Sequence, residues 1–231
     1  MLTQIPPDMT MEFIDFYGRS RDYTMTSCER MFALHEATRY VVEAGIEGDY
    51  VECGVWRGGS SMMAALTLVE LGDLDRSMYL YDTFEGMPEP TANDYSTVSG
   101  ERAGQIWAAH ERDTHNEWCY APIDDVESNM RATGYPTENV RLVKGMVEET
   151  IPAVLPERIA LLRLDTDWYE STRHELEHLY PLLAVGGVLI IDDYGHWDGA
   201  RKATDEYFAD PSRRILLSRI DYTGRMGVRV K

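Results

Sequence analysis

A short apolar strand followed by a glycine-rich turn constrains the fold of this chain more than any other part of its sequence. The stretch is Tyr50-Val51-Glu52-Cys53-Gly54-Val55-Trp56-Arg57-Gly58-Gly59-Ser60-Ser61, and an apolar helical pattern follows it. A strand, a glycine turn and a helix in this order often begin the ligand-binding half of an α/β sheet. The glycines let the backbone approach a ligand, and the first helical turn offers unpaired N–H groups. The competing interpretation is a tight strand-to-helix turn that binds nothing.

Glu52 distinguishes this turn from one that binds a dinucleotide. The dinucleotide pattern is G-x-G-x-x-G, and Glu52 stands where its first glycine is expected. A carboxylate here repels a pyrophosphate but suits the ammonium or hydroxyl groups of a ligand. S-adenosylmethionine carries both groups. The turn therefore favours that cofactor, and an NAD-dependent oxidoreductase remains a disfavoured alternative.

Composition limits the classes of partner. The 231 residues are enough for one α/β domain, so we expect residues 1–231 to form a single domain. A net charge of −18 argues against binding to nucleic acid or to an anionic membrane. Three cysteines, an odd number, suggest reduced thiols. With neither a signal-peptide pattern nor a long apolar run, the sequence predicts a soluble cytoplasmic protein.

Beyond the glycine turn, apolar runs alternate with helical patterns. Buried strands are predicted at 78–81, 140–143, 159–164 and 187–191, and a terminal hairpin at 214–219 and 226–230. This order is typical of a parallel sheet with an antiparallel edge.

Two segments do not follow the alternation. Residues 1–48 are expected to form an N-terminal arm, up to about residue 24, and then a helix. Residues 83–120 form a long polar insertion that contains several aromatic residues. Because long irregular insertions in compact domains are usually functional or disordered, we expect a lid here, with a disordered insertion as the alternative.

Carboxylates follow three of the predicted strands. Asp82 ends the second strand, and Asp165, Asp167 and the Asp192-Asp193 pair follow two later ones. Since ligands gather at the carboxyl ends of parallel strands, Asp82 is well placed for a ribose hydroxyl. The other carboxylates would repel one another unless a cation neutralised them, and Mg²⁺ prefers such oxygen ligands. Helix capping by Asp192 and Asp193, with a solvated Asp165, is the alternative.

The histidines give weaker indications of a functional site. His174-Glu175-Leu176-Glu177-His178 spells the His-Glu-x-x-His pattern of zinc proteases. On a helical wheel, however, both histidines fall opposite the leucines that define the buried side, so we expect them to face solvent. His196 lies near the acidic cluster and is a possible base or substrate contact.

Four motifs together resemble those of one known family. They are Val51-Glu52-Cys53-Gly54-Val55-Trp56-Arg57-Gly58-Gly59-Ser60, Tyr81-Asp82-Thr83-Phe84-Glu85-Gly86-Met87-Pro88, Leu164-Asp165-Thr166-Asp167-Trp168-Tyr169-Glu170-Ser171-Thr172 and Ile191-Asp192-Asp193-Tyr194. In this order they resemble the macrocin O-methyltransferase (TylF) family, over about residues 24–208. The resemblance implies the Rossmann-like class I methyltransferase fold: a seven-stranded sheet of order 3-2-1-4-5-7-6, the last strand antiparallel, with helices on both faces.

The resemblance also implies an activity and a partner set. Members of this family use S-adenosylmethionine and Mg²⁺ to methylate hydroxyl groups of small molecules, namely sugar hydroxyls of glycosylated natural products. They commonly form homo-oligomers. We therefore expect an enzyme of this kind.

The resemblance also implies roles for individual residues, which are assigned from the matching motifs. The metal ligands would be Asp165, Asp192 and Asp193, and the general base would be Asp167. The cofactor would be bound by Met25, Glu52, Gly54, Gly58, Ser60, Asp82 and Met146.

Two further alternatives stay open. A phenolic or catechol-like acceptor is possible, although catechol O-methyltransferases place a lysine shortly after the first aspartate, where Asp167 and Trp168 stand here. A non-catalytic scaffold is disfavoured, because it has no reason to keep three mutually repelling carboxylates.

Overall fold

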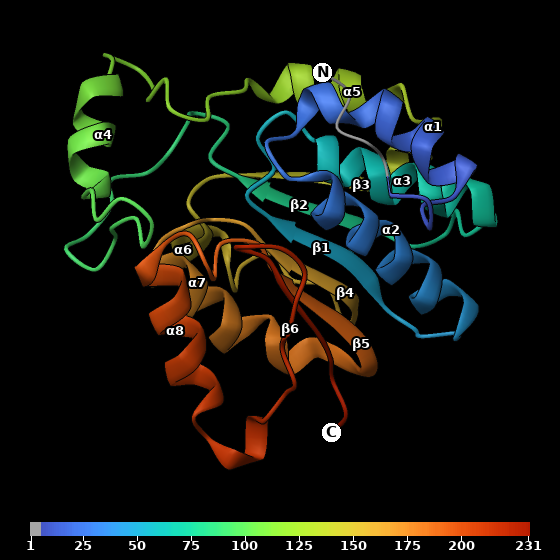
Figure 1. The fold of residues 1–231 in the computed structure, drawn as a ribbon. Helices are drawn as coiled ribbons and strands as arrows, with labels where there is room; N and C mark the ends of the chain where they lie inside the picture. The colour runs from blue at the N-terminus through green and yellow to red at the C-terminus, as the bar shows by residue number, and fades with distance from the viewer. Residues whose placement is uncertain (1–5) are drawn as a thin grey trace.

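A seven-stranded sheet forms the centre of the computed structural model, which describes residues 6–231 (Figure 1). The strands are β1 (Asp49–Cys53), β2 (Met78–Asp82), β3 (Val140–Lys144), β4 (Ile159–Leu164), β5 (Leu183–Ile191), β6 (Ser218–Arg219) and β7 (Arg225–Val228). Their order in the sheet is β3-β2-β1-β4-β5-β7-β6. The first five strands pair in parallel, while β7 runs antiparallel to both β5 and β6. The expected sheet order and antiparallel edge are confirmed.

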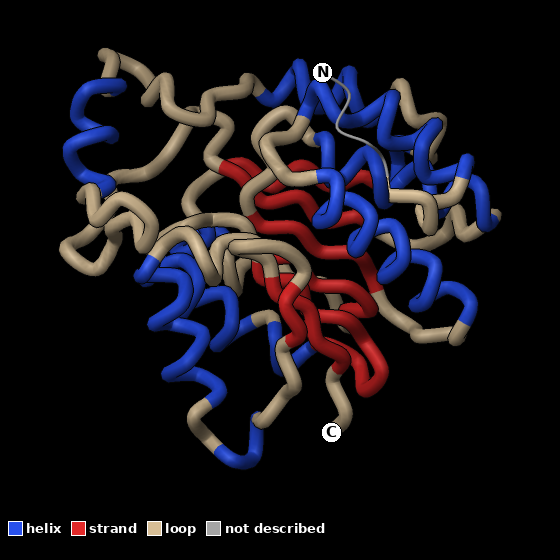
Figure 2. The backbone as a smooth tube through the Cα atoms, viewed as in Figure 1, coloured by secondary structure: helices blue, strands red, loops and turns tan. Residues whose placement is uncertain are grey.

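Helices cover both faces of the sheet (Figures 1 and 2). One layer holds α1 (Met11–Ser20), α2 (Cys28–Glu43), α3 (Gly59–Leu71) and α5 (Ile123–Arg131), and the other holds α6 (Val147–Thr150), α7 (Tyr169–His178) and α8 (Asp198–Phe208). The remaining helix, α4 (Ala103–His110), lies away from both layers, at the left of Figure 1. In residues 6–231, no helix has both the length and the apolar character that crossing a lipid bilayer requires.

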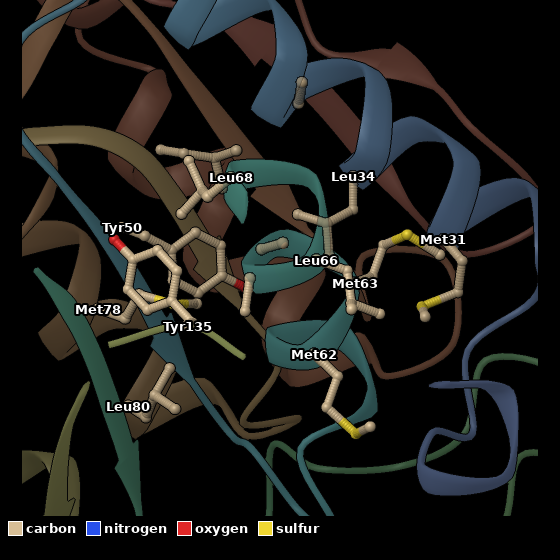
Figure 3. Packing of buried hydrophobic residues seen from close by; sticks show 14 of the residues in the cluster. Met31, Leu34, Tyr50, Met62, Met63, Leu66, Leu68, Met78, Leu80 and Tyr135 are labelled. Carbon is tan, nitrogen blue, oxygen red and sulfur yellow. The ribbon is translucent and has the colours of Figure 1, made fainter. Parts of the chain in front are cut away.

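The central helix α3 is buried on nearly all sides, which explains its apolar sequence. Every residue from Gly59 to Leu68 is buried. Met62, Met63, Leu66 and Leu68 pack in a cluster with side chains of α2 and the sheet (Figure 3). A helix that is apolar all round must lie inside the molecule. Its burial fixes the glycine turn that precedes it at the carboxyl end of β1.

The N-terminal segment differs from the expected arm. Residues 11–20 form α1, and Thr10 caps its N-terminus: the Thr10 hydroxyl accepts a hydrogen bond from the N–H of Phe13 (3.1 Å). Phe13 is fully buried, and its ring packs edge-on against Phe32 of α2, with the ring centroids 5.0 Å apart. The chain here contributes to the core because Phe13, Phe16 and Tyr17 recur at helical spacing.

Parallel strands that are covered on both faces should contain only apolar residues at their centres. Two residues break this rule. Glu52 of β1 is 1% exposed and Arg163 of β4 is 2% exposed, and the two are cross-strand partners in the β1–β4 pairing. Charges are rarely buried unless they are paired. These two residues begin a polar network that leads from the core to the site.

Candidate functional site

A cavity of about 610 Å³ opens at the carboxyl ends of the parallel strands. Residues 23–26, the glycine turn after β1, the ends of β2, β4 and β5, the 83–120 segment and the turn between β6 and β7 all contribute to its lining. Its volume is within the range that small-molecule and cofactor sites occupy in proteins. This is where ligands bind in open α/β sheets.

The glycine turn forms one wall of this cavity. Gly54 has φ +84°, and a Cβ atom there would lie 2.0 Å from the carbonyl oxygen of Asp165. Only glycine is compatible with this position. Across from it, the Asp82 carboxylate accepts hydrogen bonds from the backbone N–H groups of Val55 (2.7 Å) and Trp56 (2.9 Å). Burial raises the pKa of Asp82, and these N–H groups act against that rise. Asp82 therefore shapes the turn as well as facing the cavity.

Glu52 does not line the cavity. Its carboxylate is hydrogen-bonded by the hydroxyls of Tyr50 (2.8 Å) and Ser61, and it pairs with Arg163 (2.7 Å). Burial raises the pKa of Glu52, whereas Arg163 favours its ionised form. The carboxylate that was expected to face the ligand is instead part of the polar core.

Arg163 links this core to the site. In addition to Glu52, its guanidinium pairs with Asp165 (2.7 Å) and Asp192 (2.7 Å). The other oxygen of Asp192 pairs with Arg30 of α2, which also pairs with Asp221 (3.0 Å). Both oxygens of Asp192 are thus engaged by arginines. In this arrangement Asp192 is a counter-ion for Arg30 and Arg163.

Three other carboxylates converge in the cavity. Asp165, Asp167 and Asp193 have ligand oxygens that all lie within 4.8 Å of one another. Burial, reinforced by Asp165, raises the pKa of Asp167 to about 8. Burial also raises the pKa values of Asp165 and Asp193 well above the usual range. Among residues 6–231, the buried Oδ2 of Asp193 has no hydrogen-bond partner. A group of hard oxygen donors with an unpartnered oxygen fits a divalent cation.

The structure therefore places the predicted site residues in different settings. Of the predicted cofactor residues, Met25, Gly54, Ser60, Asp82 and Met146 line the cavity. Glu52 and Gly58 are not part of the lining. Gly58, with φ +85°, lies directly before α3 and allows the turn to enter the helix. Of the predicted metal ligands, Asp165 and Asp193 belong to the convergent group and Asp192 does not.

The histidines also differ from the expectation. His174 and His178 are half-buried rather than solvent-facing: His174 Nε2 lies 2.9 Å from the carbonyl oxygen of Ile151, and the two rings are 4.2 Å apart. His196 lines the cavity, and its Nδ1 lies 3.1 Å from the hydroxyl of Tyr222. Burial lowers the pKa of His196.

Residues 83–120, for which a lid was predicted, contribute several residues to the cavity wall. Trp118 from this segment packs against Trp168 and Trp197, with ring centroids 5.5 Å and 5.9 Å apart, and both Trp118 and Trp197 line the cavity. The predicted site residues did not include Trp197, Arg30 or Arg163. The sequence did contain one indication for Arg163: it is the single charged residue in an otherwise apolar predicted strand.

The convergent carboxylates give the metal-free protein a distinctive pH dependence. The pKa of Asp167 rises from about 4 in an unfolded chain to about 8. Between these values the native state holds more protons than the unfolded state, so the free energy of unfolding falls as pH rises. In EDTA we expect the Tm to decrease between about pH 6 and pH 8.5, measured by calorimetry. In Asp167→Asn the Tm should decrease less over the same pH range. An equal decrease of the Tm in both proteins would contradict the raised pKa assigned to Asp167.

Comparison with known proteins identifies the family. The family model described as Macrocin-O-methyltransferase (TylF) matches residues 17–227. The 8-demethyl-8-(2,3-dimethoxy-alpha-L-rhamnosyl)-tetracenomycin-C 4'-O-methyltransferase of Streptomyces olivaceus is 37% identical over 202 residues, which cover 87% of this chain and 74% of that protein. The demethyldecarbamoylnovobiocin O-methyltransferase of Streptomyces niveus is 33% identical over 202 residues, with the same coverage of both chains.

Comparison with solved structures supports the same family. The O-methyltransferase NovP superposes with a TM-score of 0.79 and 30% identity, and the match covers 90% of this chain and 83% of that one. The calicheamicin methyltransferase CalS11, at 17% identity and a TM-score of 0.63, supports the fold alone. The chain belongs to the macrocin-O-methyltransferase (TylF) family, whose members are S-adenosylmethionine-dependent O-methyltransferases.

Proposed function

We propose that this enzyme methylates a sugar hydroxyl of a glycosylated natural product and that it requires Mg²⁺. The observation that carries the proposal is the convergence of Asp165, Asp167 and Asp193 in a cavity that the glycine turn also lines. A relative at 37% identity is named for a rhamnosylated acceptor, which supports a sugar hydroxyl as the target. A phenolic or catechol-like acceptor is the second candidate.

The cofactor would lie along the glycine turn. Gly54 permits close approach of the backbone, and Ser60, Asp82 and Met146 lie around the same part of the cavity. Residues 23–26 contribute Met25 to the lining of the same cavity. S-adenosylmethionine supplies the methyl group as a sulfonium. The task of these residues is to hold that group in line with the acceptor oxygen.

Asp165 and Asp193 would hold the cation, and Asp167 would act as the base. Mg²⁺ in this group would neutralise the carboxylates and supply positive charge that lowers the pKa of a nearby hydroxyl. Asp167 would accept the hydroxyl proton at a carboxylate oxygen as the new O–C bond forms. A buried carboxylate holds a proton more readily than an ordinary aspartate, and in the protein without the cation burial raises the pKa of Asp167 to about 8. Asp192 also lines the cavity, but its oxygens are engaged by Arg30 and Arg163, so it would act as their counter-ion rather than hold the cation.

The 83–120 segment would close over the acceptor. Trp118 lines the cavity beside Trp197, so two aromatic rings face the space next to the carboxylates. Such rings can pack against the C–H face of a sugar while they exclude water from the reacting atoms. Opening and closing of the segment would then accompany binding and release.

Calorimetric titration tests the cofactor and the metal separately. We expect S-adenosylhomocysteine to bind and NAD not to bind. We also expect Mg²⁺ to bind to wild type and to bind at least about tenfold more weakly to Asp193→Asn, because one of its oxygen ligands is lost. Preference for NAD, or Mg²⁺ binding that is unchanged by Asp193→Asn, would contradict the corresponding part of the proposal.

The acceptor class needs a turnover assay. A panel should contain glycosylated polyketides, their aglycones and a simple catechol, each assayed with and without EDTA. We expect methylation of the glycosides alone, on a sugar oxygen, and loss of turnover in EDTA. Methylation of the catechol or the aglycones would instead support the second candidate.

A further inference from the structure

The turn that carries Asp165 and Asp167 has an unusual backbone. Asp167 has φ +68°, and the N–H of Trp168 donates to the carbonyl oxygen of Thr166 at 2.8 Å. A hydrogen bond from residue i+2 to residue i around a positive φ defines the rarer form of γ-turn, which is strained for a residue with a side chain. Such a conformation persists only where surrounding contacts enforce it. The enforcing contacts are therefore part of the site.

One of these contacts comes from a buried acid that is not part of the cavity lining. Glu175 of α7 has 0% exposure and is not part of the cavity lining. Its Oε1 accepts a hydrogen bond from the Thr166 hydroxyl at 2.9 Å, and in residues 6–231 its buried Oε2 has no partner. Burial raises the pKa of Glu175 well above the usual range. Glu175 thus accepts a hydrogen bond from Thr166, the residue between the two aspartates, and the Cys53 thiol lies beside its carboxyl group.

The rest of the turn is held from other directions. The Trp168 indole is buried, and its Nε1 donates to the carbonyl oxygen of Pro88 (3.1 Å). Ser171 Oγ donates to the carbonyl oxygen of Trp168 (3.2 Å). These contacts fix the end of the turn at Trp168. Thr166 Oγ1, by contrast, has Glu175 as its partner within the described part of the chain.

The stability of the fold does not explain why a carboxylic acid occupies position 175. Neighbours of Glu175 on the helix, Leu176 and Leu179, are fully buried apolar residues, and a leucine at 175 would avoid burying a carboxyl group with an unpartnered oxygen. A buried polar atom without a hydrogen-bond partner lowers the stability of the folded state. Proteins accept such local costs at functional sites.

We propose that Glu175 is a positioning residue: by accepting the Thr166 hydrogen bond it holds the strained turn that presents Asp165 and Asp167 to the cavity. The proposal rests on the proposed function, because it concerns the placement of the candidate base and cation ligand. Glu175 touches neither the cavity nor the reacting atoms. It acts through Thr166 alone.

Three variants test this. Glu175→Leu and Thr166→Val each remove one partner of the hydrogen bond, and Glu175→Gln keeps an acceptor oxygen. We expect Glu175→Leu and Thr166→Val each to lower kcat by about 10- to 100-fold, the range typical when a residue that orients a metal ligand is lost. The KM for S-adenosylmethionine should stay unchanged, because the glycine turn is not disturbed. Glu175→Gln should recover most of the turnover.

Readouts other than turnover separate positioning from folding. Mg²⁺ affinity by calorimetry should fall in Glu175→Leu, while its Tm should equal or exceed that of wild type, because an unsatisfied polar group is removed. The Glu175→Leu/Thr166→Val double variant should resemble either single variant, because both remove the same bond. Glu177→Leu, on the exposed side of α7, is the matched control and should leave kcat unchanged.

Three results would overturn the proposal: turnover and Mg²⁺ affinity that are both normal in Glu175→Leu, effects of the two single variants that add in the double variant, or a Glu175→Gln variant as impaired as Glu175→Leu. These results are distinct from failure of the proposed function. If Asp167→Asn and Asp193→Asn are fully active, the assigned roles of the aspartates fail whatever Glu175 does.

Discussion

Asp167→Asn is expected to lower kcat by roughly 10²–10⁴-fold, the range that a positioned general base contributes. Asparagine has the shape of aspartate but cannot accept the acceptor's proton. In the cavity, one oxygen of Asp167 lies within 4.8 Å of an oxygen of Asp165 and one of Asp193, and without a cation burial raises the pKa of Asp167 to about 8. The expected loss follows from the proposed role of Asp167 as the base that accepts the proton of the reacting hydroxyl. The measurement is single-turnover kinetics at saturating S-adenosylmethionine.

Two controls make this result specific. Binding of S-adenosylhomocysteine to Asp167→Asn should match wild type, which shows that the cavity is intact. His196→Gln should keep kcat within about tenfold of wild type, because His196 is hydrogen-bonded to Tyr222 and burial lowers its pKa. If His196→Gln instead caused the larger loss, the histidine would be the base and Asp167 would not be.

Arg163→Met is expected to lower the free energy of unfolding by about 3–5 kcal/mol, the usual effect of removing one partner from a buried ion pair. For a chain of this length, that corresponds to a fall in Tm of roughly 6–20 °C. The Arg163 side chain is 3% exposed and lies 2.7 Å from the carboxylates of Glu52, Asp165 and Asp192. Without the guanidinium, these acids are left in the core with too little positive charge. Thermal and urea unfolding provide the measurement.

A matched control and a rescue variant complete this test. Arg158→Met removes an arginine whose partner, Glu47, is 82% exposed, so it should change stability by less than about 1 kcal/mol. Adding Glu52→Gln to Arg163→Met should recover part of the loss, because one uncompensated charge is removed. Equal effects of Arg158→Met and Arg163→Met would show that the network does not stabilise the fold.

Local pattern was sufficient to predict most of the sheet. The runs at Ile159–Leu164 and Leu183–Ile191 are apolar because strands of a parallel sheet are covered on both faces, and that requirement appears directly in the sequence. Gly54 was predictable for a similar reason, since its φ and its close approach to Asp165 exclude any other residue. The acids at the ends of the strands could likewise be assigned to the same edge of the sheet.

The same local reasoning was less successful near the termini. Residues 11–20 were expected to be an arm, although Phe13 and Phe16 have helical spacing. Their helix is short and polar on its outer side, so its pattern was weaker than that of the central elements. Contact with α2 and α3 is what makes it part of the core.

Local patterns in the sequence predicted the alternation of strands and helices, the glycine turn and the acids at the strand ends, while the sheet order and the family followed from four motifs that resemble one family. Only the tertiary structure decided which charges and donors surround each acid. Glu52 and Asp192 are engaged by arginines from distant parts of the chain, whereas Asp167 joins Asp165 and Asp193 in the cavity. Glu175 lies behind the site, in contact with Thr166. The role of a carboxylate depends on which charges and donors surround it in space, and those partners come from separate elements whose distances only folding sets.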